Sequence, residues 1–597
     1  MLYLLVPIGA FLVRLARAPG NVSGVPGLGD AVVVSLETAT LSTAIIALLG
    51  VPLAYLLAHG RSRGSLLLGV LLQLPLAFPP LVSGILLLYL LGPYTPLGEL
   101  ANGTLTDSRI GIICSQVFVA APFAVIAARS AFGALDPGWE DVAATLGHRR
   151  WARFLRVAVP AAAPGIAAGL LLAWLRAFGE FGATVILAYH PYSLPVLTYV
   201  QFGSSGLPGT LTPVAVTLLA AFAVLLVAAW VPRLARVRRP GSGLPPPSRA
   251  VGTEPGPLLE LHLRAAVGDF RIELAHRAAH RHLAVLGPSG AGKTMTLRLI
   301  AGLARRGDSQ IAFDGTDISP LPPEHRAIGY VPQEPTLIPG LPVWRQAVFG
   351  VDSDPAVAAY WIDRLGLTEL QERRPDELSG GQRRRVALVR ALARSPRVLL
   401  LDEPSTGLDT AVRDEFRREL RALQRDTGLT TVLVTHDPTE AAMLAEEVLV
   451  VEAGRVLQAG PQPEVFAHPA TPSVARLLGV DNLCVGRVDR PGRIAAGAVE
   501  FAVPDLTAPT GARVSWGIRA ASVAVFPDDG RTSGYPALIL DVVDFGSSRE
   551  VTVDLGELQL AARTSGPYRI GDRCVVQLPP AEIAVWLDSD GELTHPG

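Results

Sequence analysis

Lysine and cysteine are scarce in this chain of 597 residues. A single lysine stands among 52 basic side chains, and the others are arginines. The three cysteines, Cys114, Cys484 and Cys574, lie far apart without a C-x-x-C pair or a histidine cluster, which excludes a disulfide framework and a zinc site as organising features. The chain also lacks a basic stripe with interleaved aromatic residues, so we predict no nucleic-acid partner.

Charge is sparse and unevenly spread. Charged residues make up 18% of the chain and hydrophobic residues 49%. The first 238 residues hold 14 arginines and eight acids, a balance of +6, so the remainder must carry −7 to give the total of −1. At about 100–200 residues per domain the length predicts three or four domains. We place a helical membrane domain at 1–238, a Pro- and Gly-rich linker at 239–257, an α/β domain at 258–479 and a small all-β domain at 480–597.

The only lysine lies in a glycine-rich motif of the pattern G-x-x-x-x-G-K-[ST], which is typical of phosphate-binding loops. The motif follows a predicted strand at 282–286 and precedes a predicted helix at 294–303, and its alternative interpretation is a turn that binds nothing. Glycines let backbone N–H groups face the phosphates, a compact ammonium reaches between the β- and γ-phosphates, and a hydroxyl is offered to Mg²⁺. The residues of this phosphate loop are Gly287, Pro288, Ser289, Gly290, Ala291, Gly292, Lys293 and Thr294.

Long apolar runs fill the first part of the chain. Runs long enough to cross a hydrocarbon core of about 30 Å occur at 32–57, 65–92, 109–131, 161–188 and 209–232. A weaker run at 1–15 is predicted as a sixth span, with a signal peptide as the alternative. Most arginines between the runs fall in alternate loops, which predicts a six-helix all-α membrane domain in a cytoplasmic (cell) membrane, with both of its ends in the cytoplasm.

The loop at 133–160 separates the fourth and fifth predicted spans. Its sequence from Glu140 to Gly147, followed by Val159-Pro160, resembles the EAA loop of ABC-importer permeases. The resemblance implies that a short helix docks into a groove of the ATPase, with Asp141, Val142, Ala143 and Gly147 as coupling residues. Asp-Val-Ala replaces the usual Glu-Ala-Ala, which keeps the charge and the apolar face. The alternative is a solvated amphipathic loop.

Two ionisable residues interrupt the apolar run at 161–188, the fifth of the six predicted spans. Arg176 and Glu180 are four residues apart, so they share one helix face. Ionisable groups at membrane depth need partners, and two interpretations stay open: a pathway lining for an anion, or a pair that locks helices together. The surrounding string from Arg176 to Thr184 resembles molybdate and sulfate permeases, which implies a tetrahedral oxyanion as the substrate.

Further motifs of the α/β domain resemble, in order, those of an ABC cassette. The signature Leu378-Ser379-Gly380-Gly381-Gln382 opens a predicted helix, and an apolar strand ends at Asp402, next to Glu403. The resemblance implies ATP and Mg²⁺ as cofactors and a head-to-tail homodimer with two ATP molecules at its interface. It implies that Glu403 polarises the attacking water and that His436 holds the γ-phosphate. It also implies that Gln333, Asp402 and Thr294 lie on the Mg²⁺ side of the nucleotide and that Asp409 belongs to the D-loop.

The residue that stacks on adenine is less defined by the sequence. Between Leu258 and Leu283 the only Phe, Tyr or Trp is Phe270. Stacking on the base and burial in the core of an early strand are both open for this ring.

The region after Gly479 has short segments of period two separated by Gly, Pro and Asp, as in Val551-Thr552-Val553-Asp554-Leu555, which predicts a small β-barrel. Trp516-Gly517-Ile518-Arg519 and Gly571-Asp572-Arg573 resemble the OB-like TOBE domain of importer ATPases. The family's Pro-Glu after Gly-Ile-Arg is Ala520-Ala521 here, which puts a regulatory contact by that Glu in doubt. A passive dimer clamp and a substrate sensor are the two open roles.

Taken together, the resemblances imply a fused ABC half-transporter that works as a homodimer through both its permease and ATPase domains. It would import an oxyanion, with molybdate favoured over sulfate and tungstate, and would receive it from a separate extracytoplasmic binding protein. The membrane lipid is its other partner, with the ATPase and TOBE-like domains on the cytoplasmic side. An exporter and a soluble ABC ATPase are the alternatives, and the importer-type loop at 133–160 argues against the first.

Overall fold

The computed structural model describes residues 2–17, 24–60, 62–235, 245–247, 255–304, 307–504, 506–529, 531–546 and 548–587. The chain forms two compact units. The first comprises Met1–Pro137 and Trp151–Gly241, and the second comprises Gly138–Arg150 and Ser242–Gly597. The predicted linker at 239–257 lies outside the described residues except for 245–247 and 255–257.

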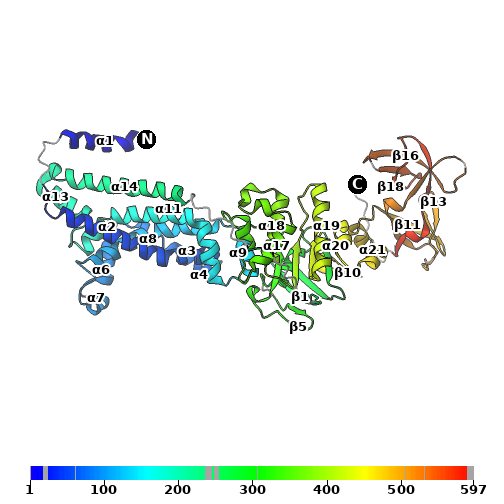
Figure 1. The fold of residues 1–597 in the computed structure, drawn as a ribbon, viewed down its shortest axis with the longest axis horizontal. Coiled ribbons are helices and arrows are strands. Elements are labelled where there is room, and N and C mark those ends of the chain that lie inside the picture. Colours follow the sequence, from blue (N-terminus) through cyan, green and yellow to red (C-terminus); the bar gives the residue numbers. More distant parts are fainter. Residues whose placement is uncertain are drawn as a thin grey trace. The chain divides into compact units, whose positions relative to one another are not determined.

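The first unit is helical, and its long helices run alongside one another in the blue to green part of Figure 1. Its described elements are α1 (Leu2–Arg17), α2 (Leu28–Ile45), η1 (Ile46–Gly50), α3 (Val51–His59), α4 (Arg63–Leu71), α5 (Leu74–Ala77), α6 (Pro80–Leu91), α7 (Pro96–Leu100), α8 (Arg109–Gly133), α10 (Arg150–Arg153), η2 (Phe154–Ala158), α11 (Val159–Phe178), α12 (Gly182–Leu187), α13 (Leu194–Gly209) and α14 (Leu211–Ala235).

Four helices among the described residues are long and apolar enough to cross a membrane: Leu28–His59, Arg109–Gly133, Arg150–Phe178 and Leu211–Ala228. A fifth span is possible where Arg63–Ala77 and Pro80–Leu91 meet at 117°. Six spans are therefore not confirmed. Helix α1 has 16 residues, short of the roughly 20 that a span needs, so the first predicted span stays a prediction.

Two predicted spans are broken rather than continuous. The run at 65–92 breaks before Pro79-Pro80, where Phe78 is extended, because a residue before proline is driven out of the helical region. The run at 161–188 breaks after Phe178, and α12 starts again at Gly182. Glu180 bridges this second break, since its Oε1 accepts a hydrogen bond from Ala183 N at 2.8 Å.

Small residues and a few polar bonds hold the helical bundle together. A side chain on Gly169 of α11 would lie 2.6 Å from Ala127 of α8, so glycine allows these two backbones to approach closely. The buried amide of Gln116 receives a bond from Ser42 at 2.9 Å and donates to Thr38 at 3.2 Å, which satisfies polar groups inside the bundle.

The second unit contains a sheet of ten strands in the order β5-β4-β1-β2-β10-β9-β3-β8-β7-β6. Strands β9, β3, β8, β7 and β6 are parallel neighbours and nearly all of their residues are buried, as expected for strands covered on both faces. The strands are β1 (Leu259–Val267), β2 (Phe270–Arg277), β3 (His282–Leu286), β4 (Gln310–Phe313), β5 (Thr316–Asp317), β6 (Ile328–Val331), β7 (Val398–Asp402), β8 (Thr430–Thr435), β9 (Glu447–Glu452) and β10 (Arg455–Pro461).

Helices cover both faces of this sheet, and one hydrophobic core lies on each face. The first core packs α17, α18 and α19 against β7 and β8, and the second packs α15 among β1, β2 and β3. The helices are α9 (Pro137–Thr145), α15 (Lys293–Ile300), η3 (Pro323–His325), α16 (Val343–Ala347), α17 (Pro355–Arg364), η4 (Thr368–Leu370), η5 (Pro375–Glu377), α18 (Gly380–Leu392), α19 (Thr410–Thr427), α20 (Pro438–Leu444), α21 (Gln462–Ala467) and α22 (Pro472–Leu477).

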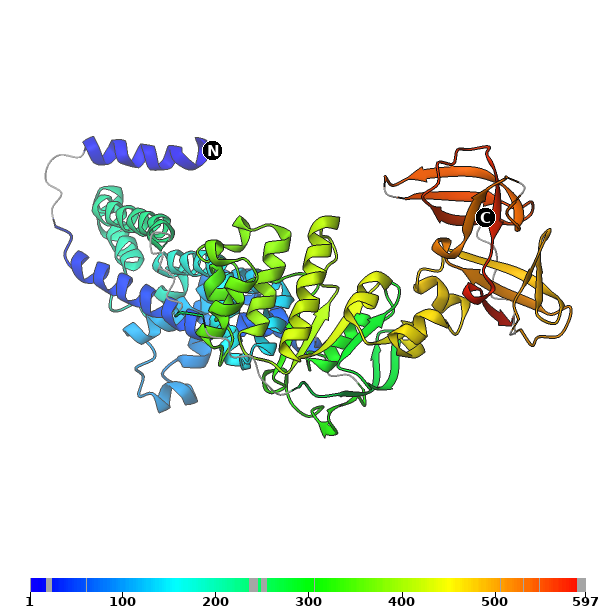
Figure 2. The ribbon, with the colours of Figure 1, turned by 45° about the vertical axis from the view of Figure 1, so that its right-hand side comes forward.

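The C-terminal region is all β, and Figure 2 shows its strands, coloured gold to red, gathered in separate sheets. The sheet orders are β13-β12-β11-β14-β20 and β15-β19-β16-β17-β18, and the two share one core around Trp516 and Phe501. The elements are β11 (Asn482–Arg490), β12 (Arg493–Ala496), β13 (Val499–Ala502), β14 (Arg513–Ile518), η6 (Ala520–Ser522), β15 (Ala524–Pro527), β16 (Tyr535–Asp544), β17 (Arg549–Asp554), β18 (Gln559–Thr564), β19 (Arg573–Gln577), η7 (Pro580–Glu582) and β20 (Ala584–Leu587). An OB-like barrel stays a prediction.

Candidate functional site

The predicted phosphate loop connects β3 to the start of α15. Gly290 and Gly292 have φ angles of +85° and +94°, a region that residues with side chains rarely adopt. At Gly287 a side chain would lie 2.2 Å from the carbonyl oxygen of Val451. The loop therefore needs glycine at these three positions, two for their backbone conformation and one for close packing.

Lys293 is the first residue of α15 and is 5% exposed. Its Nζ donates to the carbonyl oxygens of Gly287 and Pro288, both at 2.9 Å, and lies 3.8 Å from Oε1 of Glu403. Burial lowers the pKa of Lys293, and the nearby carboxylates of Glu403 and Asp402 oppose that shift. The loop thus folds around its own ammonium group, which is placed to meet an anion.

Asp402 ends β7 and lies beside the start of α15. Its Oδ1 accepts a hydrogen bond from Thr294 Oγ1 at 3.0 Å, and its Oδ2 accepts one from the Tyr330 hydroxyl at 3.4 Å. Burial raises the pKa of Asp402, and the hydrogen bonds from Thr294 and Tyr330 act against it. Tyr330 was missed by sequence reasoning because an aromatic residue in a buried strand is usually only core. Burial also raises its own pKa.

The carboxylate of Glu403 is contacted by side chains from three separate segments. Its Oε2 accepts bonds from Gln333 Nε2 at 3.2 Å and Thr406 Oγ1 at 3.1 Å, and its Oε1 lies 3.3 Å from His436 Nδ1. The structure therefore brings Gln333, Glu403 and His436 together, and their catalytic roles stay predictions. It adds Thr406, whose position three residues after Glu403 was the only available signal. The φ angle of Glu403 is +45°, an uncommon conformation for a residue with a side chain.

The signature residues form the start of α18. Ser379 caps the helix through a reciprocal pair: its hydroxyl accepts from Gln382 N at 3.3 Å, and Gln382 Oε1 accepts from Ser379 N at 2.9 Å. Ser379 and Gly380 are exposed, while Gly381 is half-buried. Asp409, also exposed, precedes α19. The hydrogen bonds described for Ser379 and Gln382 link these two residues to each other, and not to the cluster around Glu403.

Phe270 begins β2 and is half-buried against the core of the sheet. A side chain on Gly292 would lie 3.1 Å from its ring, so Phe270 borders the phosphate loop. This position is compatible with both open interpretations, and adenine stacking stays a prediction.

The segment Gly138–Arg150 belongs to the same compact unit as the ten-stranded sheet. Its Asp141 forms an ion pair of 2.7 Å with Arg298 of α15. Val142 and Ala143 are 2% and 0% exposed, so the predicted apolar face is buried. At the end of the segment, His148 Nε2 lies 2.8 Å from the carbonyl oxygen of Phe349, and Gly147 has a φ of +90°. We call Gly138–Arg150 the coupling segment, after the role that the resemblance to the EAA loop implies for it.

Two family models match the chain. Residues 276–406 match the ABC transporter model, and residues 50–237 match the model of the binding-protein-dependent transport system inner membrane component. The molybdate/tungstate import ATP-binding protein WtpC of Archaeoglobus fulgidus is 40% identical over 231 residues, which cover 38% of this chain and 95% of that relative. The chain belongs to the ABC transporter family. It joins an importer-type permease and an ABC ATPase in one polypeptide, which confirms the resemblance inferred from its motifs.

Other relatives of this ABC importer are named for the import of different substrates. The spermidine/putrescine import ATP-binding protein PotA of Acidothermus cellulolyticus is 35% identical over 335 residues, 53% of this chain and 84% of that relative. The sulfate/thiosulfate import ATP-binding protein CysA of Bacillus cereus is 41% identical over 234 residues, 37% of this chain and 65% of that relative. The ABC importer hydrolyses ATP as a member of this family.

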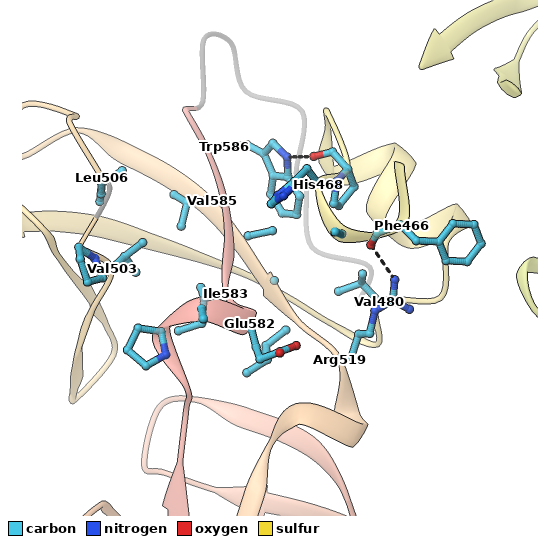
Figure 3. A pocket seen from close by; sticks show the side chains of 18 residues that line it. Phe466, His468, Val480, Val503, Leu506, Arg519, Glu582, Ile583, Val585 and Trp586 are labelled. Atoms are coloured by element: carbon cyan, nitrogen blue, oxygen red, sulfur yellow. Dashed lines mark hydrogen bonds between the residues drawn. The ribbon is translucent and has the colours of Figure 1, made fainter. Parts of the chain in front are cut away.

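The β region of the importer is tied to the ATPase by two long side chains (Figure 3). Arg519 donates to the carbonyl oxygens of Phe466 and Leu478, both at 3.1 Å, and Trp586 Nε1 donates to the carbonyl of Pro469 at 2.8 Å. These bonds satisfy carbonyl groups at the ends of α21 and α22. A cavity of about 500 Å³ lies between the two parts. The arginine of the predicted Gly-Ile-Arg motif is thus a structural bridge, while the clamp and sensor roles both remain open.

Arg176 and Glu180 lie in the helical unit of the importer and form an ion pair. Glu180 is 1% exposed and also caps α12 through Ala183 N, so its carboxylate joins the two helices on either side of the break. These bonds fit the locking interpretation, and the pathway role stays a prediction.

Proposed function

We propose that this ABC importer takes up a tetrahedral oxyanion, molybdate in the first place, across the cytoplasmic membrane. It works as a homodimer that receives its cargo from a separate extracytoplasmic binding protein, with the ATPase and β region on the cytoplasmic side. The observation that carries the proposal is the docking of the coupling segment, which belongs to the permease sequence, among residues of the ATPase. A soluble ATPase would have no use for this arrangement.

The charges of the membrane helices support an anion over a metal cation or a polyamine. Glu37 of α2 pairs with Arg109 at 3.0 Å, and Glu180 pairs with Arg176. A cation pathway needs carboxylates whose charge is not already neutralised, because a desolvated cation must be compensated by an opposite charge. The permease signature from Arg176 to Thr184 and the molybdate/tungstate name of the relative from Archaeoglobus fulgidus support the same choice.

The hydrolytic chemistry follows from the cluster around Glu403. Thr294, Asp402 and Gln333 offer the hydroxyl, carboxylate and amide oxygens that a hard cation prefers, and Thr294 and Asp402 are already 3.0 Å apart. These residues would hold Mg²⁺, which supplies charge neutralisation at the phosphates. Lys293 neutralises further phosphate charge, Glu403 polarises the attacking water, and His436, 3.3 Å from Glu403, keeps that water and the γ-phosphate in line.

The exposed start of α18 supports the homodimer. Ser379 and Gly380 present the N-terminus of a helix of 13 residues, where free N–H groups and the helix dipole favour an anion. In one copy these residues make their described bonds apart from the phosphate loop, so a second copy can supply the γ-phosphate that they would contact. Closure of the two cassettes around ATP would then move the coupling segment and change the open side of the helix bundle.

The cargo can be tested in the organism that carries the gene. We delete the gene and restore it as wild type or as Glu403→Gln, then measure molybdenum, tungsten, sulfur and iron by elemental mass spectrometry, and spermidine uptake with a radiolabel. We expect molybdenum to fall in the deletion strain and to return with the wild-type gene, but not with Glu403→Gln.

Sulfate is the second candidate, because a sulfate/thiosulfate relative is as similar as the molybdate/tungstate one. Growth with sulfate as the limiting sulfur source separates the two, since a sulfate importer restores growth and a molybdate importer does not. Unchanged molybdenum and sulfur together with a loss of iron or spermidine uptake would reject the oxyanion proposal.

A further inference from the structure

The end of the coupling segment depends on the ATPase for its backbone hydrogen bonds. The last carbonyl groups of a helix have no partners within it. Here the carbonyls of Ala143 and Ala144 are used locally by the N–H groups of His148 and Gly147, both at 3.0 Å. The next two carbonyls, of Thr145 and Leu146, accept from Arg394 Nη1 at 2.6 Å and from Val351 N at 2.9 Å.

Arg394 follows the last turn of α18, the helix that starts at the signature residues Ser379 and Gly380. Its guanidinium also donates from Nε to the carbonyl oxygen of Val351 at 2.9 Å. It therefore links α18, the turn at Val351 and the coupling segment through two backbone oxygens. An arginine suits this position because its planar fork can serve two acceptors at fixed geometry.

Side chains along helix α18 donate hydrogen bonds to the segments that follow Asp402 and Gln333. Arg384 donates to the carbonyl oxygens of Glu403 and Pro404 at 3.3 and 2.8 Å. Arg390, 1% exposed, donates to the carbonyls of Thr336 and Pro335 at 3.0 and 3.1 Å, just after Gln333. A helix of 13 residues is about 20 Å long and moves as a rigid element, so a displacement of Ser379 also displaces Arg394.

The other end of the coupling segment is held by a different helix. Asp141 pairs with Arg298 near the end of α15, which starts at Lys293 in the phosphate loop. The segment is thus attached at one point to the helix that starts at the phosphate loop and at another to the helix that starts at the signature. Two attachment points on two helices make the segment sensitive to any movement of α18 relative to α15.

We propose that Arg394 is the positioning residue through which movement of α18 reaches the coupling segment, while Arg298 anchors the segment to α15. Arg394 acts on transport through the carbonyl of Thr145 and has no part in ATP binding or hydrolysis. The inference rests on the coupling role proposed for Gly138–Arg150, but not on which ion is carried. It assigns the transmission to the signature helix and not to the Gln333 stretch alone.

The test uses three full-length variants. Arg394→Gln removes the charge and the fork. Arg394→Lys keeps one charged donor, which can serve Thr145 or Val351 but not both in the same geometry. Arg397→Ala is the matched control, because this exposed arginine lies three residues further on and donates to the carbonyl of Pro255 at 3.2 Å instead.

Hydrogen–deuterium exchange of the peptide 138–150 is measured in the detergent-solubilised full chain, with and without a non-hydrolysable ATP analogue and Mg²⁺. Basal ATP hydrolysis and molybdenum accumulation in the deletion strain are measured beside it. We expect the analogue to change the exchange of this peptide in the wild type and in Arg397→Ala, but not in Arg394→Gln. In Arg394→Gln, basal hydrolysis should stay within about twofold of the wild-type rate. Molybdenum accumulation should decrease by a factor of roughly 5–150, the range that coupling between two sites typically spans. Arg394→Lys should be intermediate in both exchange and accumulation.

A nucleotide-dependent exchange difference in Arg394→Gln equal to that of the wild type would overturn the inference. So would a wild type without any difference at 138–150. If Arg394→Gln does not fold, Arg394→Lys decides, and behaviour identical to Arg397→Ala would reject the role. A wild type that shows the exchange difference without accumulating molybdenum would reject the oxyanion proposal and leave this inference standing.

Discussion

At the scale of residues, the proposed ATP hydrolysis depends on the contacts of Glu403. The two oxygens of Glu403 are reached by Gln333, Thr406, His436 and Lys293, which come from four separate positions in the chain. A carboxylate held at this many points has little freedom to turn, which suits the role proposed for Glu403 in polarising one water molecule.

Glu403→Gln should retain ATP binding and lose turnover, because the amide keeps the shape of the side chain but cannot polarise water. Loss of one catalytic base typically lowers the rate by about 10²–10⁴-fold. Steady-state hydrolysis and equilibrium binding of a fluorescent ATP analogue measure the two effects separately. The control is Asp414→Asn, which replaces an exposed carboxylate on α19 by a carboxamide. Hydrolysis at the wild-type rate in Glu403→Gln would remove Glu403 from its role.

Lys293→Arg should bind ATP more weakly even though the charge is kept. The ammonium is 5% exposed and lies 2.9 Å from two carbonyl oxygens, so a planar guanidinium would not fit without displacing the loop. The loss of a charge-assisted hydrogen bond is worth about 1.5–3 kcal/mol, roughly a 10–100-fold change in the dissociation constant. Titration with a fluorescent ATP analogue measures it, with thermal unfolding as the check on folding. Unchanged affinity would show that the site accepts either cation.

At the scale of elements, the proposed link between ATP hydrolysis and transport rests on the coupling segment. The coupling segment is short, yet its carboxylate and its last carbonyls have partners in the ATPase, and its apolar face is buried. Gly147 makes the sharp end of this segment possible, since its φ of +90° belongs to the left-handed region that favours glycine. A change at Gly147 should therefore act on docking more than on either half of the importer.

Gly147→Trp should separate ATP use from transport. A side chain at this position would start 3.1 Å from Arg394 Nη2 and 3.2 Å from Val351 Cβ, so a tryptophan must displace the segment. Overpacking of this kind typically costs about 1–3 kcal/mol, enough to undock a segment without unfolding a large domain. We expect basal ATP hydrolysis to survive and molybdenum accumulation to disappear.

The control for this prediction is Gly133→Trp, because a side chain at Gly133 would meet open space. Both variants are compared by basal hydrolysis in detergent and by accumulation in the deletion strain. Accumulation by Gly147→Trp equal to that of the wild type would show that the coupling segment is a bystander.

At the level of the whole molecule, fusion of permease and ATPase fixes their ratio at one to one, while the proposed two-site ATP chemistry needs a second copy of the chain. The exposed signature at the start of α18 is the surface that this second copy would use. The working unit is therefore expected to be two complete chains.

Two differently tagged full-length copies should co-purify when expressed together. Each tag is used in turn for affinity purification from detergent, and the other tag is detected by immunoblotting. Copies expressed separately and mixed after solubilisation are the control for exchange or aggregation. A single tag in every purified sample, together with full ATP hydrolysis, would contradict the homodimer.

The sequence by itself determined the features that are contiguous in the chain. The phosphate loop, the pair Asp402-Glu403 and the signature were all readable, because a glycine-rich turn or a helix cap is formed by residues next to one another. The apolar runs located the membrane part for the same reason. They did not show that the runs at 65–92 and 161–188 break, although Pro79-Pro80 was a local signal for the first break.

Only the tertiary structure decided which distant residues complete these features. Tyr330 reaches Asp402 because β6 and β7 are parallel neighbours, and no spacing in the sequence predicts that strand order. Arg298 and Arg394 bind the coupling segment across more than a hundred residues of chain, and arginine is so common here that neither stood out. Motifs are local because they satisfy one turn of backbone, whereas coupling depends on contacts that form only when the chain packs.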